Sequence, residues 1–548
     1  MFVFSLILFL ATVGRCAIIR IPEDYPTVQQ GLYAATEDDT VLVADGTYYE
    51  NLKFPPLNLV LASEFLIDGD SSHISATILD GGQPTDPDSA SVIFMDGGQD
   101  SSTCVMGFTL TGGRGTLNSL WWPGYDIRYG GGCALYACSP VIKHNCFISD
   151  SSNFGSGVYM GSGTDALIQD NQFFQNHCIG GNGTIKGDSC AGRVMGNEIH
   201  HNSAYAYAAL AFLHCDTVLF LNNYIHHNTA DHTIAGSFLD GAYIFIGNII
   251  TDHSALDPWT AGSVGFLFGQ ANVIIQDNQF LRNTNGFFCS GLELVSGCSG
   301  VICENLFQDN SSVMGSAIVL WNGTYTVSYN QFINNHDSLY GVIYVGNGAV
   351  TNIHHNTITG STKVGYRASA IIGNINAPLE IHDNNIFGND APAVGVDTLC
   401  TYTIDAVNNW WGDPTGPFHP TLNPYGLGDT VGDNVLFNPW LTSYMGIQDN
   451  PIDIHPSAFR LHPAFPNPLN ATTVLSYQLP VASHVNLQVY DTAGRLVAEL
   501  VNGWRYAGDH QITFDPKGAG GSGLAAGIYF AKLEAGDFSQ VQKLVILK

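Results

Sequence analysis

The chain has 548 residues, of which 45% are hydrophobic and 12% charged, and its formal net charge is −29. A surface this acidic excludes nucleic acid and other polyanions as partners, and we expect an acidic polysaccharide to bind only through bridging cations such as calcium. Solubility in saline surroundings explains the same charge, so composition alone leaves the partner open, and no other cofactor is expected.

Residues 1–17 are expected to form a signal peptide. Residues 1–13 are apolar apart from Ser5 and Thr12, a run too short to cross a bilayer but typical of a signal-peptide core. Cleavage is expected near Cys16 or Ala17, and Arg15 makes a lipoprotein site a poor match. No other segment reaches transmembrane length, so we expect an exported chain without a membrane span after cleavage.

The segment after the leader resembles a known opening. Residues 19–30 (IRIPEDYPTVQQ) and 39–51 (DTVLVADGTYYEN) resemble the start of right-handed β-helices in the pectin-lyase-like superfamily. The resemblance implies a short amphipathic helix at about Thr27–Ala35 that covers the open hydrophobic end of a coil.

Ten asparagines then recur at intervals of 25 to 30 residues: Asn145, Asn171, Asn197, Asn223, Asn248, Asn278, Asn305, Asn330, Asn356 and Asn384. An apolar residue stands three positions before each of them, and Phe or Ile stands two positions after. A second Asn follows at plus five in seven repeats: Asn176, Asn202, Asn228, Asn283, Asn310, Asn335 and Asn389. A period of this length indicates stacked repeats, and the apolar residues alternate as in strands.

The repeat predicts a coil of short strands in which Phe and Ile stack inside and Asn stacks at a corner. Coils about 4.8 Å apart give roughly fourteen turns and a rod on the order of 65 Å long. Leucine-rich and α-helical repeats do not fit, because neither a helical period nor a Leu-rich frame appears. We expect an all-β protein, with a right-handed parallel β-helix at 18–441 followed by a small C-terminal β-sandwich.

An insertion interrupts the early repeats. Phe108 occupies the Asn position of an earlier frame, and the step from it to Asn145 is 37 residues. Aromatic faces stack on sugar rings, and loops on a rigid coil are common positions for binding sites. The alternative is that the rings only pin their loops to the coil. The predicted ligand-binding residues are Trp121, Trp122, Tyr125, Arg128 and Tyr129 in this insertion and Trp259 in a second, smaller bulge.

The sequence shows no recognisable catalytic set. Residues 263–271 (SVGFLFGQA) resemble the catalytic strand of pectin methylesterases, but Gly265 stands where the nucleophilic Asp belongs, so no covalent acyl intermediate forms by that route. The Asp pair of polygalacturonases is absent, since the one Asp-Asp lies at residues 38–39 in the N-terminal cap. Catalysis stays open, and an enzyme here would be a polysaccharide lyase or a glycoside hydrolase.

Paired histidines lie beside the Asn positions, at His200-His201, His226-His227 and His354-His355. Imidazoles stacked about 5 Å apart are a possible transition-metal site. No carboxylate or cysteine completes such a site in the sequence. Turn histidines at a repeated corner are therefore the preferred interpretation, and no metal site is predicted.

The chain has 12 cysteines and no CxxC metal spacing. Buried thiols in the coil are the preferred interpretation. One or two disulfides are the alternative in an oxidising compartment, and the pairs close in sequence are Cys133/Cys138, Cys178/Cys190 and Cys298/Cys303.

The coil is expected to close at residues 408–417 (NNWWGDPTGP), which resemble the last turn of many secreted β-helix proteins. There Trp411 takes the Phe/Ile position. Residues 442–457 are expected to be a linker. Residues 458–548 resemble the type A sorting domain of the type IX secretion system, close in pattern to the FlgD-like immunoglobulin sandwich. The matching segments are PNPLN (466–470), TVLSYQLP (473–480), VNLQVYD (485–491), GIYF (527–530) and KLVILK (543–548).

These resemblances imply a protein that the outer-membrane secretion machinery delivers to the cell surface or the medium. The expected function is to bind or process a polysaccharide or cell-surface glycan. The alternative is a non-catalytic surface or adhesion rod without carbohydrate activity.

Overall fold

The computed structural model describes residues 16–117, 126–254, 263–284, 288–295, 297–365, 367, 369–373, 376–396, 402–445, 459–461, 464, 467, 469, 472–479, 483–505, 508–516, 524–535 and 538–546. The protein is nearly all β, with 52% strand and 3% helix, which confirms the expected fold class. It divides into two compact units, Met1–Gly446 and Ile447–Lys548. Most of the linker expected at 442–457 lies outside the described residues. None of the described helices is long and apolar enough to cross a membrane.

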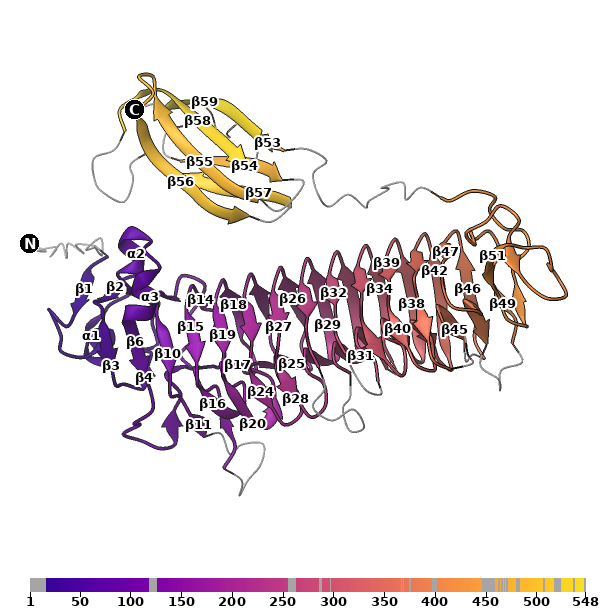
Figure 1. Cartoon of the computed structure of the whole chain (residues 1–548). Helices are drawn as coiled ribbons and strands as arrows, with labels where there is room; N and C mark the ends of the chain where they lie inside the picture. Colours follow the sequence, from indigo (N-terminus) through magenta and orange to yellow (C-terminus); the bar gives the residue numbers. More distant parts are fainter. Residues whose placement is uncertain are drawn as a thin grey trace, which may run out of the picture. The chain divides into compact units, whose positions relative to one another are not determined.

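The first unit is a β-solenoid of about 14 coils, with up to four short strands per coil (Figure 1). The first two strand positions join in one parallel sheet, because β29 (Gly236–Ile246) and β31 (Phe266–Gln276) run through both of them. The other strands at the first position are β4 (Leu52–Lys53), β8 (Ile93–Met95), β13 (Cys133–Leu135), β17 (Val158–Met160), β21 (Ile185–Asp188), β25 (Leu210–Leu213), β33 (Leu292–Leu294), β37 (Ile318–Leu320), β41 (Ile343–Val345), β45 (Ile371–Gly373) and β48 (Val394–Val396). Those at the second position are β1 (Ile18–Ile21), β2 (Thr40–Val43), β5 (Val60–Ser63), β9 (Cys104–Met106), β14 (Val141–Lys143), β18 (Asp165–Gln169), β22 (Ala191–Met195), β26 (Thr217–Leu221), β34 (Ser299–Cys303), β38 (Gly323–Ser328), β42 (Ala349–His354), β46 (Leu379–His382), β49 (Ile404–Asp405) and β52 (Val435–Leu436).

The third and fourth strand positions form separate sheets. The third is parallel and contains β3 (Gly46–Tyr48), β6 (Thr77–Asp80), β10 (Thr109–Thr111), β15 (Cys146–Ile148), β19 (Gln172–Phe174), β23 (Glu198–His200), β27 (Tyr224–His226), β30 (Ile249–Thr251), β32 (Gln279–Leu281), β35 (Leu306–Gln308), β39 (Gln331–Ile333), β43 (Thr357–Thr359) and β47 (Asn385–Phe387). The fourth position carries two sheets. The first contains β7 (Ser89–Ala90), β11 (Gly115–Leu117), β12 (Arg128–Tyr129), β16 (Ser151–Phe154), β20 (His177–Asn182), β24 (Ser203–Ala204) and β28 (Thr229–Ala230), and the second, further along, contains β36 (Ser311–Ser312), β40 (His336–Asp337) and β44 (Thr362–Lys363). In the first of these β11 runs antiparallel to both β7 and β12.

Both ends of the coil are covered as expected. Helix α1 (Val28–Ala34) starts at Thr27, whose side-chain oxygen accepts a hydrogen bond from the Gln30 amide at 3.2 Å. Its buried face places Val28 and Leu32 in the coil core. Two further short helices, α2 (Phe65–Asp68) and α3 (Ser72–Ala76), were not predicted. At the other end Trp411 is fully buried, and β50 (Pro417–Phe418) pairs with β51 (Gly428–Thr430).

Phe and Ile side chains stack in an interior column, as the repeat predicts. Phe280, Phe307 and Phe332 occupy successive coils of the third sheet, and their rings stack at centroid distances of 4.9 and 5.0 Å. All three side chains are fully buried. The column therefore supplies a continuous apolar interior.

The asparagines form a ladder along one corner. From Asn145 to Asn384, the main-chain N–H and the Nδ2 of each Asn donate to Oδ1 of the Asn on the next coil, at 2.8–3.2 Å. Asn409 of the closing segment accepts the last pair of bonds. Each corner amide thus joins two coils, as predicted.

A second ladder runs five residues further on, and it is longer than the repeated Asn indicates. Asp150 takes the Asn position before Asn176, and its Oδ1 accepts from the Gly113 amide at 2.8 Å. His253 fills the gap between Asn228 and Asn283, with its Nδ1 3.2 Å from Asn283 Oδ1 and its Nε2 3.4 Å from Asn228 Nδ2. Burial raises the pKa of the Asp150 carboxyl and lowers the pKa of His253 to about 3.

Replacing His253 by Asn should remove part of the acid sensitivity of the coil. The unfolded chain protonates this imidazole near pH 6.5, whereas the folded pKa is about 3, so the histidine costs stability as pH falls through that window. We expect the free energy of unfolding of the variant to rise relative to that of the parent by about 1.4 kcal/mol for each pH unit below 6.5. Urea melts at pH 5 should therefore show a relative gain of about 2 kcal/mol. His232→Asn, at an exposed position, is the matched control. A difference between His253→Asn and the parent that does not change with pH would contradict this account.

The second unit contains two antiparallel sheets around one core. The sheets are β53 (Arg460–Leu461), β54 (Thr473–Leu479) and β57 (Gly508–Phe514), and β56 (Leu496–Arg505), β55 (Ser483–Asp491), β58 (Gly527–Ala535) and β59 (Phe538–Ile546). Buried residues alternate along β54, and Leu475 and Tyr477 share a core with Leu487 and Leu533 of the other sheet. This arrangement is the expected small sandwich, and its FlgD-like detail remains a prediction.

Candidate functional site

The two insertions predicted to bind ligand leave the coil at the same strand position. Leu117 of β11 pairs with Arg128 of β12, and residues 118–125 connect them. His253 and Asn228 are successive residues of the second ladder, so Ser254 occupies the same place in its coil as Thr229 of β28. Residues 255–262 follow Ser254 in the sequence and form the second insertion. The path from β12 through β16, β20, β24 and β28 to Ser254 covers about 24 Å at roughly 4.8 Å per coil. Four predicted site residues lie outside the described residues: Trp121, Trp122, Tyr125 and Trp259.

Arg128 is held at the base of the first insertion. Its Nη1 donates to the carbonyl oxygens of Pro87 and Gly115, and its Nη2 lies 3.4 Å from Asp88 Oδ1. Its main-chain N–H donates to Asn153 Oδ1 at 2.9 Å. These contacts fix the guanidinium while leaving part of it exposed.

Tyr129 is buried, with 4% of its surface exposed. Its ring stacks on Phe154 at a centroid distance of 5.2 Å and contacts Tyr159 at 4.7 Å. Burial raises the pKa of Tyr129 to about 12. These surroundings match the alternative stated above, in which a ring pins the insertion to the coil.

A row of exposed and half-buried side chains runs along the coil from Arg128 toward Ser254, the described residues that border the two insertions. Ile179 in β20 is 59% exposed, and Tyr205, directly after β24, is 62% exposed. The Tyr205 ring meets the His232 ring edge to face at 5.8 Å. We name Arg128, Asn153, Ile179, Tyr205 and His232 the lateral strip.

The repeat does not predict the lateral strip, because its Asn and Phe/Ile positions mark the buried side chains of each coil. Asn153, Ile179 and Tyr205 each stand three residues after a second-ladder residue, so they share one outward position of the frame. Beneath them Cys178, Ala204 and Ala230 pack in a small core of their own. An isoleucine and a tyrosine at an outward position were the signal available in the sequence.

The outer face of the first strand position, where a coil enzyme would hold catalytic groups, is mostly closed. Ala211, Ser237 and Val319 on this face are buried. Glu293 accepts a hydrogen bond from the Ser263 hydroxyl, and burial raises the pKa of its carboxyl. A Cβ on Gly265 would lie 1.8 Å from the Gly291 carbonyl oxygen, so this coil has no room for an aspartate there.

Lys186 on the same face is a buried cation that the sequence does not predict. Its Nζ donates to Asp188 Oδ1 at 2.7 Å, and burial lowers its pKa. The nearby Sγ atoms of Cys190 and Cys215 lie 3.5 Å apart. Strand pairing shifts by one residue between Asp188↔Leu213 and Gly192↔Val218, which places Cys215 beside Cys190. The 11 described cysteines are free thiols, and most of them are buried.

The paired histidines stack at repeated corners, as expected. His200 stacks on His226 at 4.9 Å and His201 on His227 at 5.3 Å. His201 and His227 have φ near +50°, a turn conformation. One carboxylate does reach the pairs, since Glu198 Oε1 lies 3.2 Å from His226 Nε2, but the described residues around them do not form a three-ligand group. Glu198 comes from the neighbouring coil, a contact that sequence spacing alone does not reveal.

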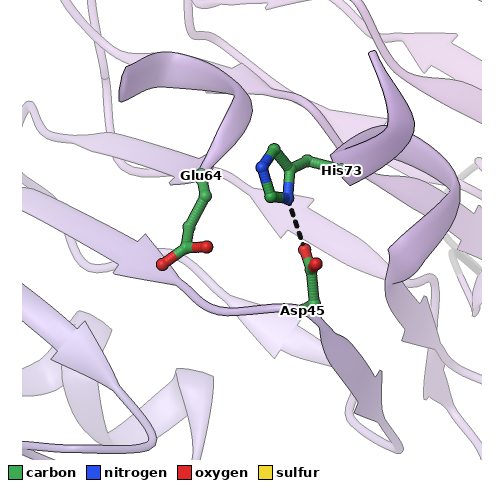
Figure 2. A group of neighbouring side chains, drawn as sticks. All are labelled: Asp45, Glu64 and His73. Carbon is green, nitrogen blue, oxygen red and sulfur yellow. Dashed lines mark hydrogen bonds and ion pairs between the residues drawn. The ribbon is translucent and has the colours of Figure 1, made fainter. Parts of the chain in front are cut away.

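One group near the N-terminal end of the coil has the composition of a metal site. Asp45, Glu64 and His73 each offer one ligand atom, and these atoms lie within 4.8 Å of one another (Figure 2). Asp45 follows β2, Glu64 caps α2 and His73 belongs to α3. His73 Nδ1 lies 2.7 Å from Asp45 Oδ1, and this hydrogen bond raises the pKa of His73. The unpredicted helices α2 and α3 bring the three residues together.

Comparison with known proteins identifies both units. Residues 213–358 match the family described as "Right handed beta helix region", and residues 463–547 match the "Secretion system C-terminal sorting domain". The coil is therefore a right-handed β-helix, and the sorting domain marks a protein secreted to the cell surface or the exterior. No curated protein matches the chain.

Two solved structures are distantly similar. The tailspike protein of E. coli bacteriophage HK620, in complex with a pentasaccharide, is 10% identical with a TM-score of 0.32, over 87% of this chain and 86% of its own. The enzymatically active domain of bacteriophage CBA120 tailspike protein 2 is 9% identical with a TM-score of 0.18, over 97% of this chain and 76% of its own. Both superpose poorly on the chain.

Proposed function

We propose that this exported β-helix binds an extracellular or cell-surface polysaccharide along the lateral strip, with the two insertions at its ends. The observation that carries the proposal is the exposed pair Ile179 and Tyr205 on consecutive coils. An aromatic ring and an aliphatic side chain in one row fit the apolar C–H faces of sugars. Arg128, Asn153 and His232 supply hydrogen-bonding groups beside them.

A neutral glycan fits this surface better than a polyuronate. Asp88 lies against Arg128 and offsets its charge, and Asp231 is exposed next to His232. The chain as a whole carries a net charge of −29, so a polyanion would be repelled unless cations bridged it. Calcium dependence is thus expected only for acidic polysaccharides.

Binding without turnover is the form of this function that the described geometry supports. Hydrolysis of a glycosidic bond generally needs two carboxyl groups flanking it. The lateral strip, as far as it is described, has no such pair, and the half-buried Glu293 lies on another face. If the purified chain binds no member of a polysaccharide panel, with or without calcium, the alternative of an inert surface rod is favoured. Release of reducing ends or unsaturated products would instead establish an enzyme.

Removing aromatic anchors should weaken binding without unfolding the coil. We expect Tyr205→Ala, and separately the paired Trp121→Ala and Trp122→Ala, each to cost about 1–3 kcal/mol of affinity for the glycan bound by the parent. Titration calorimetry measures the loss, and thermal melting checks the fold.

Tyr33→Ala is the matched control for these variants, because Tyr33 is 65% exposed but belongs to α1. Unchanged affinity in both strip variants would exclude this face. Unchanged affinity with a lower melting temperature in the Trp pair would show that those rings only support their loop.

A further inference from the structure

We propose that Asp45, Glu64 and His73 form a binding site for a divalent transition-metal ion, separate from the lateral strip. Two carboxylates and one imidazole make a mixed oxygen and nitrogen set, which suits Zn²⁺, Mn²⁺ or Fe²⁺ better than Ca²⁺ or Mg²⁺. One ligand atom from each residue lies within 4.8 Å of the others, so small side-chain rotations bring all three onto one ion (Figure 2).

The surroundings of His73 have the form that metal-binding histidines usually show. Its Nδ1 faces Asp45, while its Nε2 lies 3.3 Å from Asp68 Oδ2 on the far side of the ring. A ligating histidine typically donates its second ring N–H to a carboxylate, which fixes the tautomer and the ring orientation. Asp68 is placed to do this while Nδ1 takes the ion.

The carboxylate of Asp45 is also supported from behind. The hydroxyl of Thr77, a buried residue, donates to Asp45 Oδ1 at 3.2 Å. Hydrogen bonds to ligating carboxylates hold them in position for an ion. Asp45 and His73 are therefore each held in place by a further residue. Carboxylates that are merely close together on an acidic surface lack such support.

Charge at the site is unbalanced without a cation. Glu64 has no hydrogen bond or ion pair from its carboxylate in the described part of the chain, yet it faces Asp45 and His73 (Figure 2). Burial, together with nearby carboxylates that include Asp45 and Glu64, raises the pKa of Tyr48. A divalent ion would neutralise the carboxylates of Asp45 and Glu64 and would give Glu64 a partner.

The position of the site defines what an ion would do. Asp45 belongs to the coil between β2 and β3, whereas Glu64 and His73 belong to the segment carrying α2 and α3. An ion joined to all three would tie that segment to the coil near the capped end. Its direct consequence is greater stability of the N-terminal coils.

The test uses the full chain without a histidine tag, titrated by calorimetry with Zn²⁺, Mn²⁺ and Ca²⁺ after chelation and desalting. We expect saturable binding of one Zn²⁺ or Mn²⁺ per chain, a higher melting temperature with that metal, and weaker binding of Ca²⁺. Glu64→Gln should weaken binding at least tenfold, and His73→Ala should abolish it. Because the Glu64 carboxylate has no partner in the described chain, Glu64→Gln should keep the melting temperature of the metal-free parent.

His214→Ala is the matched control. His214 is an exposed histidine 2.8 Å from Asp240 Oδ2, so it has one carboxylate partner but not the second carboxylate and the supporting residues. It should bind metal like the parent. Absence of saturable Zn²⁺ or Mn²⁺ binding overturns the proposal, as does binding that Glu64→Gln leaves unchanged. Equal loss in His214→Ala would show diffuse binding to an acidic surface and would overturn it too.

Discussion

Replacing Phe280 by Ala is expected to lower the free energy of unfolding of the β-helix by about 3–5 kcal/mol. The ring is fully buried, stacks on Phe307 at 4.9 Å and meets Phe266 edge to face at 5.8 Å. Because the coils above and below are held by both Asn ladders, they cannot close over the lost ring, and a cavity remains. Urea melts followed by circular dichroism measure the change.

Phe418→Ala is the control, since Phe418 is 37% exposed in β50 near the end of the coil. It should change stability by less than about 0.5 kcal/mol. If Phe280→Ala melted like the parent, Phe280 would not occupy an interior column. The register assigned to the whole repeat would then be wrong.

Ending the chain at Tyr444 is expected to stop delivery to the surface. The sorting domain at residues 463–547 is then missing, so the shortened chain should accumulate in the periplasm while the full chain reaches the surface or the medium. The β-helix should still fold, because its core and the core of the second unit contain separate sets of residues. Cell fractionation with antibody detection measures the distribution.

Fusion of residues 458–548 to an unrelated periplasmic protein is the reciprocal control, and we expect it to reach the surface. Equal surface delivery of the shortened and full chains would make the C-terminal sandwich a passive module. A full chain that loses its C-terminal unit on arrival would show that the sorting domain is removed after transport.

Most of the buried positions of the coil could be predicted from the sequence. The spacing of Asn145, Asn171 and their successors predicted the corner ladder, and the Phe or Ile two residues later predicted the stacked column. These positions repeat because one apolar interior and one corner geometry recur on every coil. Helix α1 and the buried Trp411 were predicted from resemblance and were confirmed.

The surface was less predictable, because contacts between coils depend on small shifts that spacing does not record. Cys215 meets Cys190 only through a one-residue change of register, and Glu198 contacts His226 on the next coil. Asp45, Glu64 and His73 come together through two short helices, and no periodic pattern in the sequence predicts those helices. The outward orientation of Tyr205 follows only from the fourth strand position, which the sequence pattern did not predict.

The paired ladders also bear on how such a rod changes length during evolution. Between Asn171 and Asn228 each coil presents the same two amides to its neighbours, 26 residues apart at both corners. A gene segment encoding one such coil can therefore be duplicated or lost by unequal recombination, and the coils on either side meet the same hydrogen-bonding partners as before. The coils that carry Asp150 and His253 are not interchangeable in this way, because each offers a different group at one corner. Recombination within this short stretch would thus alter the reach of the rod, and the spacing of the two insertions, while both caps stay in place.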